Sequence, residues 1–279
     1  RRWPRSGRGG RSRRRVRWSS SPRRCPVATL GPWRPVAAAG ALVVVAAALV
    51  VPVVALADWL LAAGPRWDAG EWSAAVVSTL WLSAVAAVVC TVAALPLGVL
   101  VARYRSPVTR TLEGASYVAH GLPGIVIAIA MVSVGVVALR PFYQREPLLI
   151  LAYAVLLVPV AVGSVRAAIE ATPVRHEEVA RSLGRGPFAA FASITARGAA
   201  PGIAAGAALV LLTCMKELPI TLLLRPTGTD TMATRLWTYS SVSDYASAAP
   251  YAAALVVLAA LPTAAIGLWS AQVVEVRDT

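Results

Sequence analysis

Six long apolar runs constrain the fold of this chain more strongly than any other feature of its sequence. None of them contains Asp, Glu, Lys or Arg, and each is long enough as a helix to cross about 30 Å of hydrocarbon. Charged residues make up 14% of the chain, whereas soluble domains carry roughly 25%. The sequence therefore predicts an all-α polytopic membrane protein with about six transmembrane helices, at 36–57, 74–102, 115–139, 147–165, 198–215 and 251–269.

The net charge of +14 belongs to an N-terminal tail and not to the apolar runs. Residues 1–35 hold twelve arginines and no acidic residue, in a mixture without helical or strand period. We expect a disordered cytoplasmic arm, with anionic lipid as the alternative partner and no specific nucleic-acid partner. The tail is otherwise a linker remnant of a longer protein or a mis-called start. The predicted division is this tail, a transmembrane domain at 36–272 and a cytoplasmic tail at 273–279.

The distribution of arginine predicts how the chain is oriented in the membrane. The connections at 103–113 and 166–197 carry eight arginines. The positive-inside rule places these connections and both termini in the cytoplasm, which requires an even number of spans. We expect a multi-pass protein of the bacterial plasma (inner) membrane.

Several kinds of chemistry are not supported by the sequence. Lys216 is the one lysine and is followed by Glu217, so the Gly-Lys-Ser/Thr of a phosphate-binding loop is missing. No zinc motif or nucleophile elbow occurs, and the three cysteines form no CxxC pair. The apolar runs also lack the acidic residues of ion-coupled carriers. We therefore expect no enzymatic activity, no cofactor and no metal, with the energy for transport supplied by a partner.

The long connection before the fifth run predicts two short helices. Thr172 is a candidate N-cap with proline after it, and Gly184 is placed to end the first helix in a left-handed conformation. Val179, Ala180 and Leu183 are expected on one face. The residues alone leave two interpretations open, a docking element for another protein or an interfacial helix on lipid headgroups.

The same connection resembles the EAA motif of binding-protein-dependent ABC importer permeases. Glu178, Ala180, Gly184 and Ile194 have the spacing of that motif, while Val179 replaces its middle alanine and its Leu-Pro is missing. The resemblance implies the MetI-like permease fold, and a coupling helix that fits a groove on a separate ATPase subunit. The residues that it implies for ATPase coupling are Glu177, Glu178, Ala180, Arg181, Leu183, Gly184 and Ile194.

Three further stretches resemble the iron(III)-type branch of these permeases, at 121–126, 215–226 and 233–237. The resemblance covers roughly 70–270 and looks like the second half of a two-half permease. It implies ABC ATPase subunits, a second permease half and an extracytoplasmic solute-binding protein as partners. A permease for thiamine, sulfate, molybdate or a polyamine is the alternative within the family, and a membrane scaffold without transport is the alternative outside it.

Four residues are candidates for the translocation path or its gate: Pro123, Lys216, Glu217 and Pro219. Lys216 and Glu217 follow the fifth run, and ionisable residues at membrane depth often mark pathways. An interfacial pair with a snorkelling lysine is the simpler interpretation. Prolines within spans are more often tolerated bends than functional kinks.

Overall fold

The computed structural model describes residues 31–63, 68–104 and 106–278, and the predictions made for residues 1–30 lie outside it. Every regular element within the described residues is a helix. The chain divides into two units between Val51 and Pro52. The helices are η1 (Gly31–Trp33), α1 (Arg34–Ala63), α2 (Ala69–Arg103), α3 (Pro107–His120), α4 (Gly124–Val137), η2 (Arg140–Phe142), α5 (Glu146–Glu170), α6 (Val174–Ser182), α7 (Pro187–Ala190), η3 (Phe191–Ala196), α8 (Arg197–Met215), α9 (Pro219–Leu224), α10 (Met232–Ser241) and α11 (Tyr245–Asp278).

The predicted spans are confirmed for most of the chain. The described part contains five helices long and apolar enough to cross a membrane, or six spans if one bent pair counts as a single span. The first two apolar runs become α1 and α2, and the fourth becomes α5. The last helix, α11, continues to Asp278, so residues 273–278, expected as a tail, are helical.

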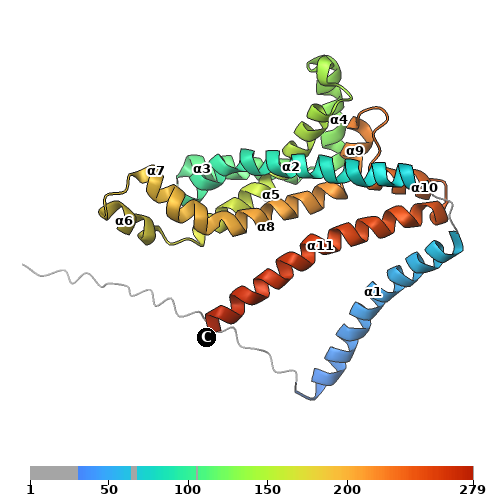
Figure 1. Ribbon diagram of the computed structural model, residues 1–279, viewed down its shortest axis with the longest axis horizontal. Helices are drawn as coiled ribbons and strands as arrows, with labels where there is room; N and C mark the ends of the chain where they lie inside the picture. Colours follow the sequence, from blue (N-terminus) through green and yellow to red (C-terminus); the bar gives the residue numbers. More distant parts are fainter. Residues whose placement is uncertain (1–30, 64–67, 105, 279) are drawn as a thin grey trace, which may run out of the picture. The chain divides into compact units, whose positions relative to one another are not determined.

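A bundle of α2, α5 and α8 forms the centre of the second unit (Figure 1). The side chains of Cys90, Leu157 and Val210, one from each helix, are completely buried there. Small residues let the helices approach closely. A Cβ built on Gly202 of α8 would lie 2.7 Å from the Cβ of Ala168 in α5, so only glycine fits.

The third apolar run is not the continuous span that the sequence predicts. It consists of α3 and α4, which meet at an angle of 96°, so α4 runs in a different direction from α3 (Figure 1) while it packs against the first part of α5, where a Cβ on Gly135 would lie 2.6 Å from Leu148. The break lies at Leu122 and Pro123. Proline lacks the N–H that a continuing helix needs and disfavours helical geometry in the residue before it. Pro123 becomes the N-cap residue of α4.

The fifth run begins earlier than its hydropathy indicates. Residues Pro187–Met215 form one helical stretch, because α7 and α8 are joined by the π-helical segment η3. The π-helical turn widens the backbone ladder at this position, and such turns are frequent at functional sites.

Candidate functional site

The connection with the EAA-like spacing forms the predicted helix, but it begins later than expected. Its helix, α6, starts at Val174, and the N-cap residue Pro173 makes no side-chain cap. The prediction that Thr172 caps the helix is wrong. The Thr172 amide donates to the carbonyl of Ile169 at 3.0 Å, so Thr172 still belongs to the turn that ends α5.

Gly184 ends α6 in the way the sequence predicts. Its φ is +87°, the left-handed region that favours glycine. The Gly184 amide donates to the Arg181 carbonyl at 3.0 Å, and the Arg185 amide donates to the Ala180 carbonyl at 3.1 Å. This bond pair is the Schellman ending of a helix. A Cβ on Gly184 would meet no atom within 4 Å, so the glycine is needed here for its conformation alone.

Val179, Ala180 and Leu183 do not lie on one face of α6 as the sequence predicts, because the helix has a buried side and an exposed side. Glu177 and Ala180 are buried, whereas Val179 and Leu183 are 57% and 80% exposed. Ala180 therefore does not share an environment with Val179 and Leu183. Phe188, near the start of the next helix, is also apolar and 83% exposed. We call Val179, Leu183 and Phe188 the apolar tip.

The burial of Glu177 follows from two partners outside α6 that sequence reasoning did not identify, in addition to Arg181 of α6, whose Nη2 lies 3.8 Å from Glu177 Oε2. Its Oε1 pairs with Nη2 of Arg103, the last residue of α2, and accepts from the hydroxyl of Thr195 in η3. The same Arg103 nitrogen donates to Thr195 Oγ1 at 2.9 Å. From the sequence, Arg103 was used only to orient the chain in the membrane. Thr195 directly follows Ile194 of the EAA-like motif.

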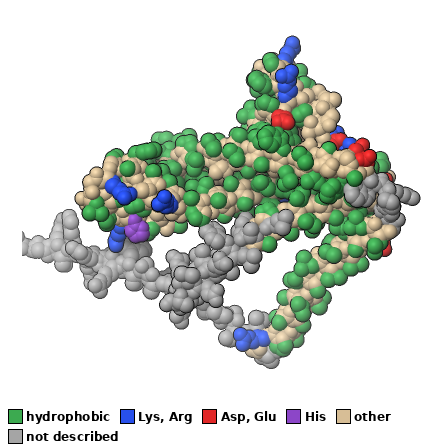
Figure 2. Space-filling model, viewed as in Figure 1, with side chains coloured by type: hydrophobic (Ala, Val, Ile, Leu, Met, Phe, Trp, Pro, Cys, Tyr) green, Lys and Arg blue, Asp and Glu red, His purple; other side chains and the backbone are tan. Residues whose placement is uncertain are grey.

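The other residues assigned to coupling lie on or near the surface of the loop. Glu178, Arg181, Leu183 and Gly184 are exposed, and Ile194 is half-buried. Basic and histidine side chains gather at this end of the bundle, around α6 and α7 (Figure 2). They include Arg175, His176, Arg181 and Arg185, all of which are exposed.

The residues assigned to the path come together in part. A Cβ built on Gly124, directly after Pro123, would lie 2.8 Å from Glu217 Oε1, which places this carboxylate at the start of α4. The Glu217 side chain also accepts from the Ile220 amide at 3.3 Å, and Pro219 is the first residue of α9. Lys216 is exposed and lines a separate cavity of about 240 Å³ with Trp237.

Glu217 lies two residues after Met215, the last residue of α8, in a turn that packs beside α5. The turn after α8 is fixed by Tyr153 of α5, whose hydroxyl bonds the Thr221 hydroxyl. His120, just before the break, lies with Nδ1 3.2 Å from the Leu156 carbonyl oxygen. Both contacts fall in the first half of the 25-residue α5. The turn that contains Glu217 and the break between α3 and α4 therefore both lie beside the first half of α5.

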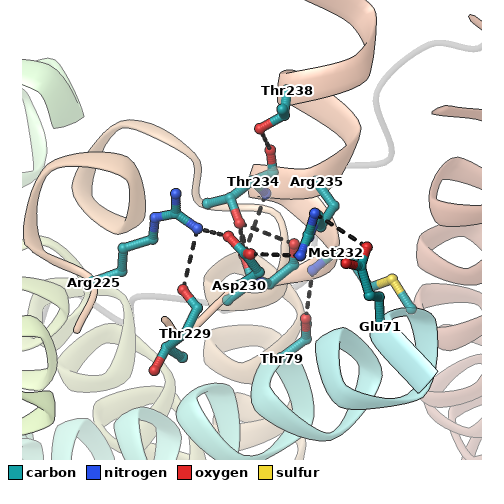
Figure 3. A network of polar contacts seen from close by, with 10 residues as sticks. Glu71, Thr79, Arg225, Thr229, Asp230, Met232, Thr234, Arg235 and Thr238 are labelled. Carbon is teal, nitrogen blue, oxygen red and sulfur yellow. Dashed lines mark hydrogen bonds and ion pairs between the residues drawn. The ribbon is translucent and has the colours of Figure 1, made fainter. Parts of the chain in front are cut away.

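A polar network at the opposite end of the bundle was also missed by the sequence analysis (Figure 3). Arg235 of α10 reaches Asp230 at 2.9 Å and Glu71 of α2 at 3.3 Å. Asp230 also pairs with Arg225, whose guanidinium pKa is lowered by burial and, to a smaller extent, by Arg235. The network joins the loop after α9 to the first turn of α2.

Comparison with known proteins decides the family of this fold. Residues 94–277 match the family described as binding-protein-dependent transport system inner membrane component. The chain belongs to this family. It is therefore a multi-pass membrane permease of the ABC importer type, as the EAA-like spacing indicated.

One curated relative of this permease is the Fe(3+)-transport system permease protein FbpB 2 of Haemophilus influenzae. The two are 36% identical over 215 residues, which is 76% of this chain and 42% of that protein. The chain thus spans less than half the length of this relative.

Solved structures agree on the fold. One is the inward-facing MetNI methionine ABC transporter, with a TM-score of 0.60 and 20% identity over 68% of this chain and 90% of that one. Another is a bacterial alginate ABC transporter in complex with an alginate pentasaccharide-bound periplasmic protein. Its TM-score is 0.63, with 15% identity over 82% of this chain and 91% of that one.

Proposed function

We propose that this permease forms half of the translocation path of an ATP-driven importer and receives force from separate ATPase subunits through α6. The apolar tip is the observation that carries the proposal. Val179, Leu183 and Phe188 are exposed on a connection that is otherwise rich in arginine. Exposed apolar patches rimmed by charge mark protein or membrane contacts, and a groove on an ATPase is the contact that the EAA-like spacing implies.

The partners follow from the fold and from the length of the relative. The chain spans 42% of the iron(III) permease that it matches, so a second permease half is expected to complete the path. A periplasmic protein is present in the alginate transporter structure of the same fold. An extracytoplasmic binding protein is accordingly proposed at the end of the bundle opposite α6.

The orientation proposed from the arginines is compatible with the folded chain. The end of α2 at Arg103, the apolar tip and the exposed arginines of α6 lie at one end of the bundle. The positive-inside rule assigns this end to the cytoplasm. Both termini are then cytoplasmic, and residues 36–272 form the transmembrane permease domain.

Iron(III) is the substrate that we propose. The relative at 36% identity is an Fe(3+) permease, and a carboxylate beside α5 suits a cation. Glu217 provides this carboxylate at the break before α4, with Pro123 and Pro219 at the ends of the two adjoining helices. We also assign Lys216 to the outer side of this path, although its exposed side chain lines the neighbouring cavity with Trp237. The binding protein would supply most of the selectivity.

Reconstitution of the chain with its genomic neighbours tests this function. The permease is co-expressed with the second permease half, P-loop ATPase and binding protein that are encoded beside it, and the purified complex is placed in proteoliposomes. ATP-dependent uptake of radioactive iron(III) is expected, with none of thiamine, sulfate, molybdate or spermidine. Uptake of another of these solutes would overturn the substrate, and failure of the ATPase to co-purify would overturn the coupling role of α6.

A further inference from the structure

One acidic residue of α6, Glu177, faces inward, although the other charged residues of this helix are exposed. Glu177 is 6% exposed, while the apolar Val179 and Leu183 on the same helix face outward. Removing a carboxylate from water is costly unless charge and hydrogen bonds compensate for it. Glu177 has both, since Arg103 supplies the charge and Thr195 supplies a hydroxyl.

Each member of this cluster comes from a different element. Arg103 ends α2, Glu177 lies in the first turn of α6, and Thr195 lies in the π-helical segment η3 that leads into α8. Thr195 is completely buried, and the side chains of Arg103 and Glu177 are 15% and 8% exposed. The cluster is largely shielded from solvent, and every member bonds the other two.

The location of the cluster relates it to the membrane helices. Arg103 and Thr195 belong to elements continuous with α2 and α8, two of the three helices of the bundle. In contrast, α6 itself is a nine-residue helix with no side-chain N-cap. Without the cluster, a movement of the apolar tip would be absorbed by the loops around α6.

We infer that Arg103, Glu177 and Thr195 form an ionic latch through which α6 moves α2 and α8 as one body. The three are positioning residues, because none of them lies in the apolar tip. This inference rests on the proposed coupling role of α6. Its specific content is that the latch sets how much transport accompanies each ATP hydrolysed, whereas the apolar tip sets whether the ATPase binds.

The first experiment measures coupling in the reconstituted complex. Glu177→Gln and Arg103→Gln should leave the ATPase bound, and should lower iron(III) uptake per ATP hydrolysed by between about twofold and thirtyfold. The swapped pair R103E/E177R should restore it, because the Thr195 hydroxyl can donate to the carboxylate and accept from the guanidinium at either position. Glu170→Gln, which breaks an exposed ion pair with Arg166 at the same end of the bundle, should keep the wild-type ratio.

A second experiment uses the purified full chain alone in lipid nanodiscs. A nitroxide label at Ser182, on the exposed end of α6, is introduced after the three native cysteines are replaced. Its spectrum should be ordered in the otherwise unchanged chain and in R103E/E177R, and mobile in Glu177→Gln. This readout does not require the ATPase, so it tests the latch even where the proposed function fails.

The outcomes separate the two ideas. Absence of ATP-dependent uptake in the wild-type complex overturns the proposed function. Normal uptake per ATP in Glu177→Gln, or an ordered label in that variant, overturns the latch. Thr195→Val keeps both charges and removes the shared hydroxyl, so it should show a smaller loss in the same ratio. A swapped pair that behaves no better than the single variants also overturns the latch.

Discussion

Gly184 offers a test in which backbone strain and side-chain bulk can be separated. Its φ of +87° is left-handed, and a Cβ there would meet no atom of the chain within 4 Å. For a residue other than glycine this conformation costs about 1–2 kcal/mol. Asparagine tolerates it better than most residues. The isolated chain should therefore respond to Gly184→Ala and Gly184→Trp alike, and less to Gly184→Asn.

The magnitude follows from the strain alone. A cost of about 1–2 kcal/mol lowers the population of the correctly ended helix roughly five- to thirtyfold relative to its frayed form. Hydrogen exchange of the Arg185 amide, which donates to the Ala180 carbonyl in the helix ending, reports this population. Exchange should accelerate by a similar factor in the alanine and tryptophan variants of Gly184.

Docking adds a dependence on size that the isolated chain does not have. If α6 enters a groove of the ATPase, Gly184→Trp should abolish co-purification and uptake, while Gly184→Ala retains part of both. A helix resting on lipid headgroups would behave differently, because tryptophan is favoured at the membrane interface. Normal ATPase binding by Gly184→Trp, with membrane insertion unchanged, would refute the docking argument.

Three further substitutions test the bundle, the polar network and the path. Gly202→Val should destabilise the chain by about 1–3 kcal/mol through overpacking against Ala168, as measured by thermal unfolding in detergent. Gly114→Val is the control, because a Cβ at Gly114 would meet no atom within 4 Å. Arg235→Ala should cost about 1 kcal/mol, since its two ion pairs are partly exposed, and high salt should reduce that difference. Glu217→Gln should lower iron(III) uptake about tenfold, which corresponds to a loss of ~1.4 kcal/mol, and Glu217→Asp should lower it less. Equal uptake by the wild type and Glu217→Gln would show that this carboxylate is not part of the path.

The sequence predicted the continuous spans, such as α2 and α5, and missed the bend between α3 and α4. Uncharged runs specify burial in lipid, and α2 and α5 accordingly lie within a few residues of the predicted ranges. Hydropathy does not report changes in helix direction, so the apolar run at 115–139 was predicted as one span although the chain bends by 96° within it. The Leu122-Pro123 step was the local signal, and proline in a span is also compatible with a mild kink.

In the connection between α5 and α8, the sequence predicted only those features that depend on neighbouring residues. Gly184 was identified because a helix ending depends on a few neighbouring residues. Thr172 was misassigned because the end of α5 extends one turn further than its apolar pattern. The burial of Glu177 depends on Arg103, which is distant in sequence. No pattern within the loop reports such a partner.

A carboxylate at position 177 fixes the position of α6 more precisely than an apolar side chain would. A leucine there would bury as readily, and a well-packed apolar side chain is often as stabilising as a buried ion pair. An apolar contact, however, is not directional, so a short helix held only by such contacts can slide or rotate. Glu177 bonds two fixed partners, and these bonds are broken by either movement. The inferred latch would therefore favour a defined position of α6 over maximal stability, as the coupling role proposed for α6 requires.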